Sequence, residues 1–225
     1  MNTEQSSVER RASAFAALGD PVRLAIVDRL AASDELPSDL AEELGIRSNL
    51  LAHHLNVLEE AGLVRRQRSE ADRRRTYVQL VPGAVPAVAG ASVAAPQRVL
   101  FVCTANTARS QLAALLWQAL SDVPAVSAGT HPADAIAPGA VAAAKRHRLS
   151  LTHSTKPQHL TDVQLPGDLV ITVCDRAHEE LHDPAALHWS VPDPVPAGTT
   201  RAFEAAVHDL DTRVHGLAHR LSAAS

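Results

Sequence analysis

The sequence predicts two folded domains, a mainly α-helical one that ends in a β-hairpin and an α/β one with a small parallel sheet. Up to residue 81, apolar residues recur at helical spacing, whereas from residue 98 onward short apolar strands alternate with helical stretches. Between them, residues 82–97 are rich in Ala, Pro, Gly and Val and carry no charge. We interpret this segment as a linker, although its apolar composition leaves open that part of it packs on either domain.

Composition narrows the class of protein. The chain has 225 residues, enough for a separate core in each domain, with 46% hydrophobic and 20% charged residues. Its apolar runs are too short to span a membrane, and residues 1–11 lack the apolar core of a signal peptide. The 2 cysteines, both in the second domain, indicate reactive thiols in a reducing cytoplasm rather than a disulfide framework. A net charge of −4 favours no particular partner.

The first domain is predicted to be a winged helix-turn-helix. Apolar spacing predicts four helices, over residues 12–18, 21–32, 37–44 and 47–61. Gly45 and Gly62 stop the last two, and a basic hairpin that ends in residues 77–80 follows. Two short helices across a tight turn with a hairpin behind them form this motif.

Polar groups early in the last of these helices are placed to touch base edges, namely Arg47, Ser48, Asn49 and His53, with His54 at the border of the core. The hairpin carries six arginines that phosphates would neutralise, namely Arg65, Arg66, Arg68, Arg73, Arg74 and Arg75. A basic hairpin on its own is often only solvated, but the helical context favours a site for double-stranded operator DNA.

Three phrases in this domain resemble the ArsR family of winged-helix repressors: ALGDPVRL at residues 17–24, LAEELG at 40–45, and the run from His53 to Val64. The resemblance implies DNA binding as a homodimer, although no closing helix is predicted where the linker begins. The domain contains no cysteine, so the thiolate pair with which many members sense soft metals is absent.

The second domain is predicted from strands over residues 99–102, 125–128 and 168–173 that alternate with helices over 110–120, 138–147 and 201–221. The first strand ends at Cys103, and Arg109 and Ser110 open the next helix. A strand that turns into a helix leaves backbone N–H groups free to bind an anion, and Arg109 adds a planar, two-pronged donor. The same positive field stabilises a Cys103 thiolate aimed at the central atom of a bound oxyanion.

The pattern V-C-x-x-N-x-x-R-S at residues 102–110 resembles the low-molecular-weight protein tyrosine phosphatases and the arsenate reductases that share their fold. Ser127–Thr130 and Asp193-Pro194 extend the resemblance over roughly residues 97–222. It implies that Cys103 is the nucleophile and Asp193 the general acid. The oxyanion would be held by the loop and its arginine, that is Thr104, Ala105, Asn106, Thr107, Ala108, Arg109 and Ser110.

Cys174 separates three hypotheses for this domain. An arsenate reductase needs a second thiol, and Cys174 follows a strand where thioredoxin-coupled reductases keep theirs, although their third cysteine is absent from residues 176–183. An external thioredoxin-like or low-molecular-weight thiol would then be the reductant, with no bound cofactor. The alternatives are a phosphatase, with Cys174 a buried filler, and an oxyanion or redox sensor with little turnover.

Two further details favour the reductase. Val195 and Pro196 stand where the phosphatases commonly carry tyrosines, and Ala108 where they carry a second loop cysteine. No metal site is predicted: His178, His182 and His188 lack a cysteine or carboxylate that completes a tetrahedral set. His208, His215 and His219 are expected on the solvated face of the last helix.

Overall fold

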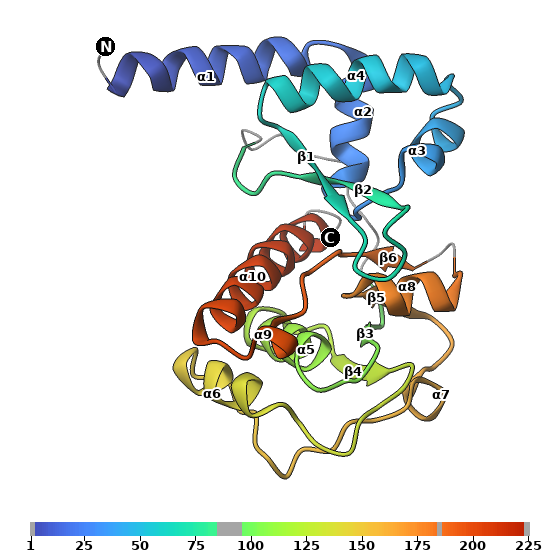
Figure 1. Cartoon of the computed structure of the whole chain (residues 1–225), viewed down its shortest axis with the longest axis vertical. Coiled ribbons are helices and arrows are strands. Elements are labelled where there is room, and N and C mark those ends of the chain that lie inside the picture. Colours follow the sequence, from blue (N-terminus) through green and yellow to red (C-terminus); the bar gives the residue numbers. More distant parts are fainter. Residues whose placement is uncertain (1–2, 85–95, 184–185, 223–225) are drawn as a thin grey trace. The chain divides into compact units, whose positions relative to one another are not determined.

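The computed structural model describes residues 3–84, 96–183 and 186–222, which divide into two units (Figure 1). The first is built mainly from residues 1–69 and 73–91, the second mainly from residues 92–225. Most of the predicted linker, including the place of a closing ArsR-type helix, lies outside the described residues, so the boundaries at 81 and 98 stay predictions. Among the helices described, none is long and apolar enough to cross a membrane.

The first unit contains the predicted helices and hairpin. They are α1 (Thr3–Leu18), α2 (Pro21–Leu30), α3 (Pro37–Glu43), α4 (Ser48–Glu60), β1 (Val64–Arg68) and β2 (Thr76–Leu80). The two strands pair antiparallel, with Val64 opposite Leu80. Helix α1 begins before residue 12, where the apolar spacing starts, because its first turns are too polar to show an apolar stripe; the ArsR resemblance implies a first helix from about Gln5.

Local chemistry accounts for the helix ends of this unit. The Asp20 carboxylate accepts hydrogen bonds from the N–H groups of Val22 and Arg23 and so caps α2, whose first residue is Pro21. Gly45 and Gly62 follow α3 and α4 at φ of 62° and 70°, a region that glycine enters without strain. Side chains from all four helices and the hairpin then share one apolar core.

The second unit is a parallel sheet of four strands, β3 (Arg98–Cys103), β4 (Ala125–Gly129), β5 (Asp168–Thr172) and β6 (Leu187–His188), in the order β4-β3-β5-β6. The helices are α5 (Arg109–Leu120), α6 (Pro138–Arg146), α7 (Leu160–Val163), α8 (Asp175–Leu181), α9 (Pro194–Ala197) and α10 (Thr200–Ser222). The predicted fold class, with its small parallel sheet, is therefore confirmed.

Helix α5 packs against β3, β4 and α10, and α8 contacts β3 and β5 (Figure 1). The central strand β3 is buried from Val99 to Cys103, so its hydrophobic run is continuous rather than alternating. Because all strands are parallel, their carboxyl ends meet at one edge, which gathers Cys103 after β3 and Cys174 two residues after β5. The candidate site forms at that edge.

Four short elements were not predicted, namely α7, α8, α9 and β6. None has more than seven residues, too few for a helical or strand period to stand out. Each depends on contacts with distant segments: β6, for example, pairs with β5 through Ile171 and Thr172.

Candidate active site and nucleic-acid interface

The Cys103 sulfur lies at the bottom of the loop between β3 and α5. Its side chain is buried, and Sγ lies 3.1 Å from Ser110 Oγ and accepts the N–H of Asn106 at 3.2 Å. The Ser110 hydroxyl already accepts a hydrogen bond from Asn106 Nδ2 at 2.9 Å, so its own hydrogen is available to the sulfur. Two donors thus converge on Cys103, as a stabilised thiolate requires.

Four carbonyl groups of the loop face one segment, residues 130–137, which follows β4. Those of Cys103, Thr104, Ala105 and Thr107 accept the N–H groups of Thr130, His131, Ala133 and Ala137, respectively. In a planar trans peptide the N–H points opposite to the carbonyl, so the N–H groups of residues 104, 105, 106 and 108 face the other way. The N–H of Asn106 reaches Cys103 Sγ, so these N–H groups and the sulfur lie on the same side of the loop, as an anion-binding cradle requires.

Asn106 holds the loop in shape. Its φ of 53° is the left-handed conformation, which Asn tolerates better than most residues. The side chain is fully buried; Nδ2 donates to Ser110 Oγ and to Ser127 Oγ at 3.0 Å, while Oδ1 accepts from Gln111 Nε2 and from the Gln158 N–H, both at 2.9 Å. Sequence reasoning missed Gln111, a buried polar side chain directly after Arg109 and Ser110, and this polar position before an apolar run was its available signal.

Arg109 and Asp193 are brought together across 84 residues of sequence. Arg109 Nη2 lies 2.9 Å from Asp193 Oδ2, and Nη1 donates to the Val191 carbonyl at 2.9 Å. Burial alone would lower the pKa of Arg109, but the charges of Cys174 and Cys103 in their thiolate forms, together with Asp193, outweigh burial and hold the pKa above its ordinary value. Asp193 also caps α9 by accepting the Val195 N–H at 3.0 Å. Its carboxylate is therefore held at the mouth of the loop.

Cys174 lies on the rim of the same loop. Its Sγ is 3.4 Å from the hydroxyl of Thr104, the residue after Cys103, and accepts the Ala177 N–H at 3.4 Å as the cap of α8. Burial raises the pKa of the Cys174 thiol; Arg109 opposes that effect and a charge on Cys103 adds to it. Both cysteines are free thiols.

Aromatic side chains do not border this site. The chain has 6 of them: in the second unit Phe101, Trp117, Trp189 and Phe203 are all buried, and Phe15 and Tyr77 belong to the first unit. The site thus offers no exposed ring on which an aryl group would stack. No group of three His, Cys, Asp or Glu side chains that could hold a metal ion occurs in the part of the chain described.

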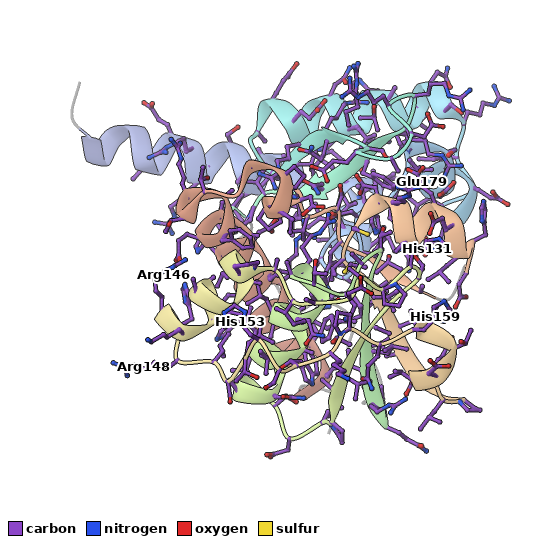
Figure 2. All side chains as sticks on the ribbon, turned by 60° about the horizontal axis from the view of Figure 1, so that its bottom comes forward. His131, Arg146, Arg148, His153, His159 and Glu179 are labelled. Atoms are coloured by element: carbon purple, nitrogen blue, oxygen red, sulfur yellow. The ribbon has the colours of Figure 1, made fainter. Side chains whose placement is uncertain are left out.

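Several histidines of the second unit lie outside the Cys103 loop. His208, His215 and His219 lie on the exposed face of α10, as expected. His131 follows β4 and pairs at 3.3 Å with Glu180 on α8, and His159 caps α7 (Figure 2). His178 and His188 stack on each other, with ring centroids 4.1 Å apart.

In the first unit, the predicted base-reading residues lie at the start of α4. Arg47, Ser48, Asn49 and His53 are all exposed, whereas His54 is buried, with its Nδ1 3.7 Å from Asp20 Oδ1. The helix therefore presents its first turn to solvent and its apolar face to the core. This is the arrangement that a recognition helix requires.

The arginines of the hairpin divide into two sets. Arg65 Nε donates to Gln79 Oε1 at 2.9 Å, and Arg66 forms an ion pair at 3.0 Å with Glu59 of α4, so both side chains are engaged inside the unit. Arg68, Arg73 and Arg74 are exposed, and Arg75 is half-buried. Arg65 and Arg66 are exposed as well, but these contacts hold their side chains inside the unit, so Arg68 and Arg73 are the better placed to meet phosphates.

Two family models match the chain. One, described as low molecular weight phosphotyrosine protein phosphatase, matches residues 98–225, and one described as a helix-turn-helix domain matches residues 18–67. A curated relative, the transcriptional repressor SdpR of Bacillus subtilis, is 38% identical over 50 residues, or 22% of this chain and 56% of the relative. The chain thus spans little more than half of that repressor's length.

Solved structures similar to this chain cover its second unit. An arsenate reductase from Archaeoglobus fulgidus is 26% identical with a TM-score of 0.46, over 54% of this chain and 98% of that chain. The YwlE arginine phosphatase of Geobacillus stearothermophilus is 24% identical with a TM-score of 0.48, over 57% and 95%. The tyrosine phosphatase AmsI of Erwinia amylovora is 23% identical with a TM-score of 0.49, over 57% and 95%.

Proposed function

The chain belongs through residues 98–225 to the low molecular weight phosphotyrosine protein phosphatase family and carries an ArsR-like helix-turn-helix domain before it, and we propose that it is a DNA-binding regulator fused to a thiol-dependent arsenate reductase. One observation carries the choice of reductase: Cys174 Sγ lies at the rim of the Cys103 loop, 3.4 Å from Thr104 Oγ1. A phosphatase needs only one cysteine, because water hydrolyses the phosphocysteine. A reductase needs a second thiol within reach of the first.

The proposed reaction uses both thiols in sequence. The Cys103 thiolate attacks the arsenic of a bound arsenate and displaces one oxygen, which leaves as water after protonation. The Cys174 sulfur then attacks Cys103 Sγ, the S–As bond breaks with its electron pair passing to arsenic, and arsenite leaves as the disulfide forms. Arsenate and two thiols give arsenite, one disulfide and water, so atoms and electrons balance.

The other residues of the site have matching roles. The inward N–H groups of the loop and the Arg109 guanidinium hold the oxygens of the anion. Asp193, which lies 2.9 Å from Arg109 at the mouth of the loop, supplies the proton for the departing oxygen. Ser110 stabilises the Cys103 thiolate through the hydroxyl hydrogen that Asn106 leaves available.

The absence of an exposed aromatic side chain in the described part of the second unit supports a small inorganic substrate over phosphotyrosine. Aryl phosphates would keep the phosphate contacts but lose stacking on a ring. We place the protein in the cytoplasm, where a thioredoxin-like protein or a low-molecular-weight thiol would reduce the Cys103–Cys174 disulfide.

The second candidate activity is phosphatase chemistry. The observation that favours it is that the loop, Arg109 and Asp193 form a complete phosphoryl-transfer site without Cys174. Phosphatase activity therefore requires only Cys103, whereas reductase activity requires both cysteines. An oxyanion or redox sensor would show neither activity at a useful rate.

The test is a single-turnover assay of reduced protein with arsenate, beside p-nitrophenyl phosphate hydrolysis by the same sample. We expect one arsenite for each chain without added reductant, lost in both Cys103→Ser and Cys174→Ser. Hydrolysis should require only Cys103. Arsenite release that survives Cys174→Ser, or no release from the wild-type chain beside rapid hydrolysis, contradicts the reductase.

For the first unit we propose binding to double-stranded operator DNA as a homodimer, with the first turn of α4 at base edges and the exposed hairpin arginines on phosphates. Arg68→Ala and Arg73→Ala should weaken binding to all sequences and reduce the dependence of log Kd on log salt by about one each. Asn49→Ala should instead relax preference among operator variants.

The matched control for these variants is Arg146→Ala, which removes an arginine that pairs with Glu204 in the second unit. The Kd of the wild-type chain and of each of the four variants is measured by titrating labelled duplexes at several salt concentrations. An unchanged salt dependence for Arg68→Ala and Arg73→Ala would show that the hairpin is only solvated.

A further inference from the structure

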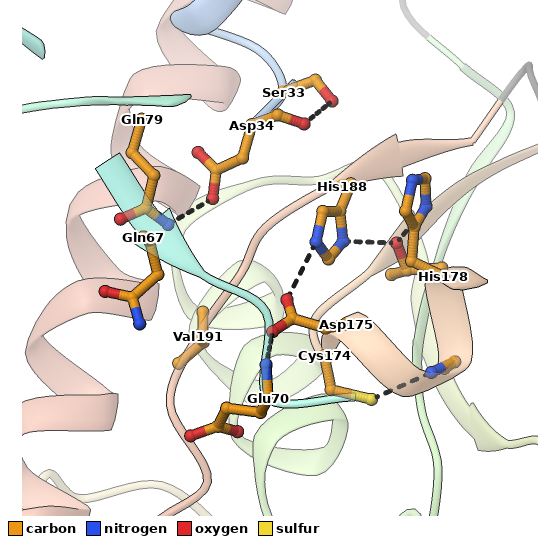
Figure 3. Close-up of polar contacts among 12 residues, drawn as sticks. Ser33, Asp34, Gln67, Glu70, Gln79, Cys174, Asp175, His178, His188 and Val191 are labelled. Carbon is orange, nitrogen blue, oxygen red and sulfur yellow. Dashed lines mark hydrogen bonds and ion pairs between the residues drawn. The ribbon is translucent and has the colours of Figure 1, made fainter. Parts of the chain in front are cut away.

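A buried polar network beside Cys174 has no part in the chemistry described above. Its members are Thr172 at the end of β5, Asp175 and His178 on α8, and His188 on β6. His188 Nε2 lies 3.1 Å from Asp175 Oδ1, and His188 Nδ1 lies 2.9 Å from Thr172 Oγ1 (Figure 3). His188 is fully buried and Asp175 nearly so, which is costly unless both are paired.

Hydrogen bonds join the members of this network. The Thr172 hydroxyl donates to the Leu187 carbonyl at 3.1 Å and lies 2.9 Å from His188 Nδ1 and 3.2 Å from His178 Nδ1. Because an ionised carboxylate only accepts, His188 Nε2 donates to Asp175. The His188 ring is therefore held by Thr172 on one side and by Asp175 on the other.

Asp175 is well suited to retain its negative charge. Burial acts to raise the pKa of the Asp175 carboxyl, but hydrogen bonds from His188 and Ser190 outweigh that effect and hold the pKa below its ordinary value. The carboxylate thus ties the first residue of α8 to β6 and to the segment that follows it.

Cys174 is joined directly to this anchor. Its backbone is extended, with φ of −156° and ψ of 146°, and its Sγ faces Thr104 on the loop, whereas the neighbouring Asp175 side chain faces β6. Thr172, two residues before Cys174, is held to the same His188. The chain on both sides of Cys174 is therefore fixed by one imidazole.

We infer that His188 and Asp175 are positioning residues for Cys174. They hold its sulfur in the position from which it attacks Cys103. This inference rests on the proposed role of Cys174 as the second thiol. Asp175 is linked to Arg109 through Glu70, whose N–H donates to Asp175 Oδ2 at 2.7 Å and whose carboxylate lies 3.5 Å from Arg109 Nη1. Because that link is indirect, the Cys103 step should depend on the network much less than the Cys174 step does. A displacement of about 1 Å costs a reaction on the order of 100-fold in rate, so the disulfide-forming step should be sensitive to it.

The experiment compares two rates in Asp175→Ala, Asp175→Asn and His188→Gln of the full-length chain. The rate of Cys103 alkylation by iodoacetate measures the reactivity of the first thiol in its loop. The rate of Cys103–Cys174 disulfide formation measures the reactivity of the second thiol, and the oxidant is arsenate in one series and diamide in another. We expect disulfide formation to slow at least about tenfold in Asp175→Ala and His188→Gln, with alkylation within twofold of wild type. Asp175→Asn, which keeps an acceptor for His188, should be intermediate.

Asp168→Asn is the control for simple loss of stability. Asp168 Oδ2 pairs with Arg98 at 2.6 Å at the opposite end of β5, away from Cys174. The Asp168→Asn substitution should lower the thermal midpoint of unfolding while leaving disulfide formation at the wild-type rate. The inference is overturned if the network variants form the disulfide as fast as wild type, or if alkylation, disulfide formation and stability fall together as in a partly unfolded protein.

The two oxidants separate this inference from the proposed function. If the wild-type chain releases no arsenite but forms the disulfide with diamide, the reductase proposal fails and the diamide series still tests the positioning role. If arsenite is released at the wild-type rate by every network variant, the reductase proposal stands and the positioning role fails.

Discussion

At the scale of single residues, the two thiols lie in different surroundings. Cys103 Sγ receives the Asn106 N–H and is in reach of the Ser110 hydroxyl, whereas Cys174 Sγ receives one longer N–H bond and faces Thr104. Burial raises the pKa of the Cys174 thiol above its ordinary value. This difference suits a reaction in which the Cys103 sulfur attacks first and Cys174 stays a neutral thiol until the second step.

This raised pKa predicts a pH dependence for the second step. At neutral pH Cys174 is a thiol, and only the thiolate attacks, so the rate of disulfide formation should rise with pH through neutrality and beyond the pKa of an ordinary cysteine. Single-turnover disulfide formation, measured by quenching at successive pH values after the Cys103 step is complete, gives the profile. A rate that is already constant below neutral pH would contradict the prediction.

At the scale of elements, the loop depends on how closely β4 approaches it. A Cβ added to Gly129 would lie 2.6 Å from the Thr104 carbonyl oxygen and 3.1 Å from Asn106 Cβ, so glycine is required there for reasons of space. The same strand end leads into the segment whose N–H groups donate to the outward carbonyls of the loop. The Ser-Ala-Gly-Thr sequence at residues 127–130 is thus part of the cradle rather than only a strand.

Gly129→Ala should therefore disturb the cradle. We expect a loss of about 1–3 kcal/mol in the free energy of unfolding, because the opposing atom is backbone and cannot move aside. Phosphate should also become a weaker competitive inhibitor of the substrate. Gly216→Ala on α10 is the matched control: nothing lies within 4 Å of its added Cβ, and helix propensity should stabilise the protein by up to about 1 kcal/mol. Equal effects of the two substitutions in urea unfolding would show that the contact with Thr104 is unimportant.

At the scale of the whole molecule, each unit has a hydrophobic core of its own. One core gathers buried residues from Ala14 to Val78, and the other gathers buried residues from Val99 to Leu221. Two separate cores give each unit its own source of stability.

We therefore expect two unfolding transitions in calorimetry of the full chain, with different responses to ligand. Phosphate at about 100 times its Kd should stabilise the second unit by about 2.7 kcal/mol and raise only its transition, and operator DNA should raise only the other. A single transition raised by both ligands would show that the two cores unfold together.

Much of this architecture was predictable because its signals are local. The buried strand before Cys103, the helix after it, the Asp20 cap and the glycines that end α3 and α4 are all contained within a few residues of sequence. The loop residues were identified for the same reason, since the whole anion cradle from Cys103 to Ser110 is continuous in the chain.

The remaining features required distant segments to meet. The pairing of Arg109 with Asp193, the approach of Cys174 to Thr104, and the hydrogen bond between His188 and Asp175 each join residues that no sequence period connects. Short elements such as α8 and β6 exist only because β5 and the loop hold them. The sequence by itself determined the two fold classes and predicted the nucleophile and its anion loop; only the tertiary structure decided which groups surround them, because that depends on where parallel strands end.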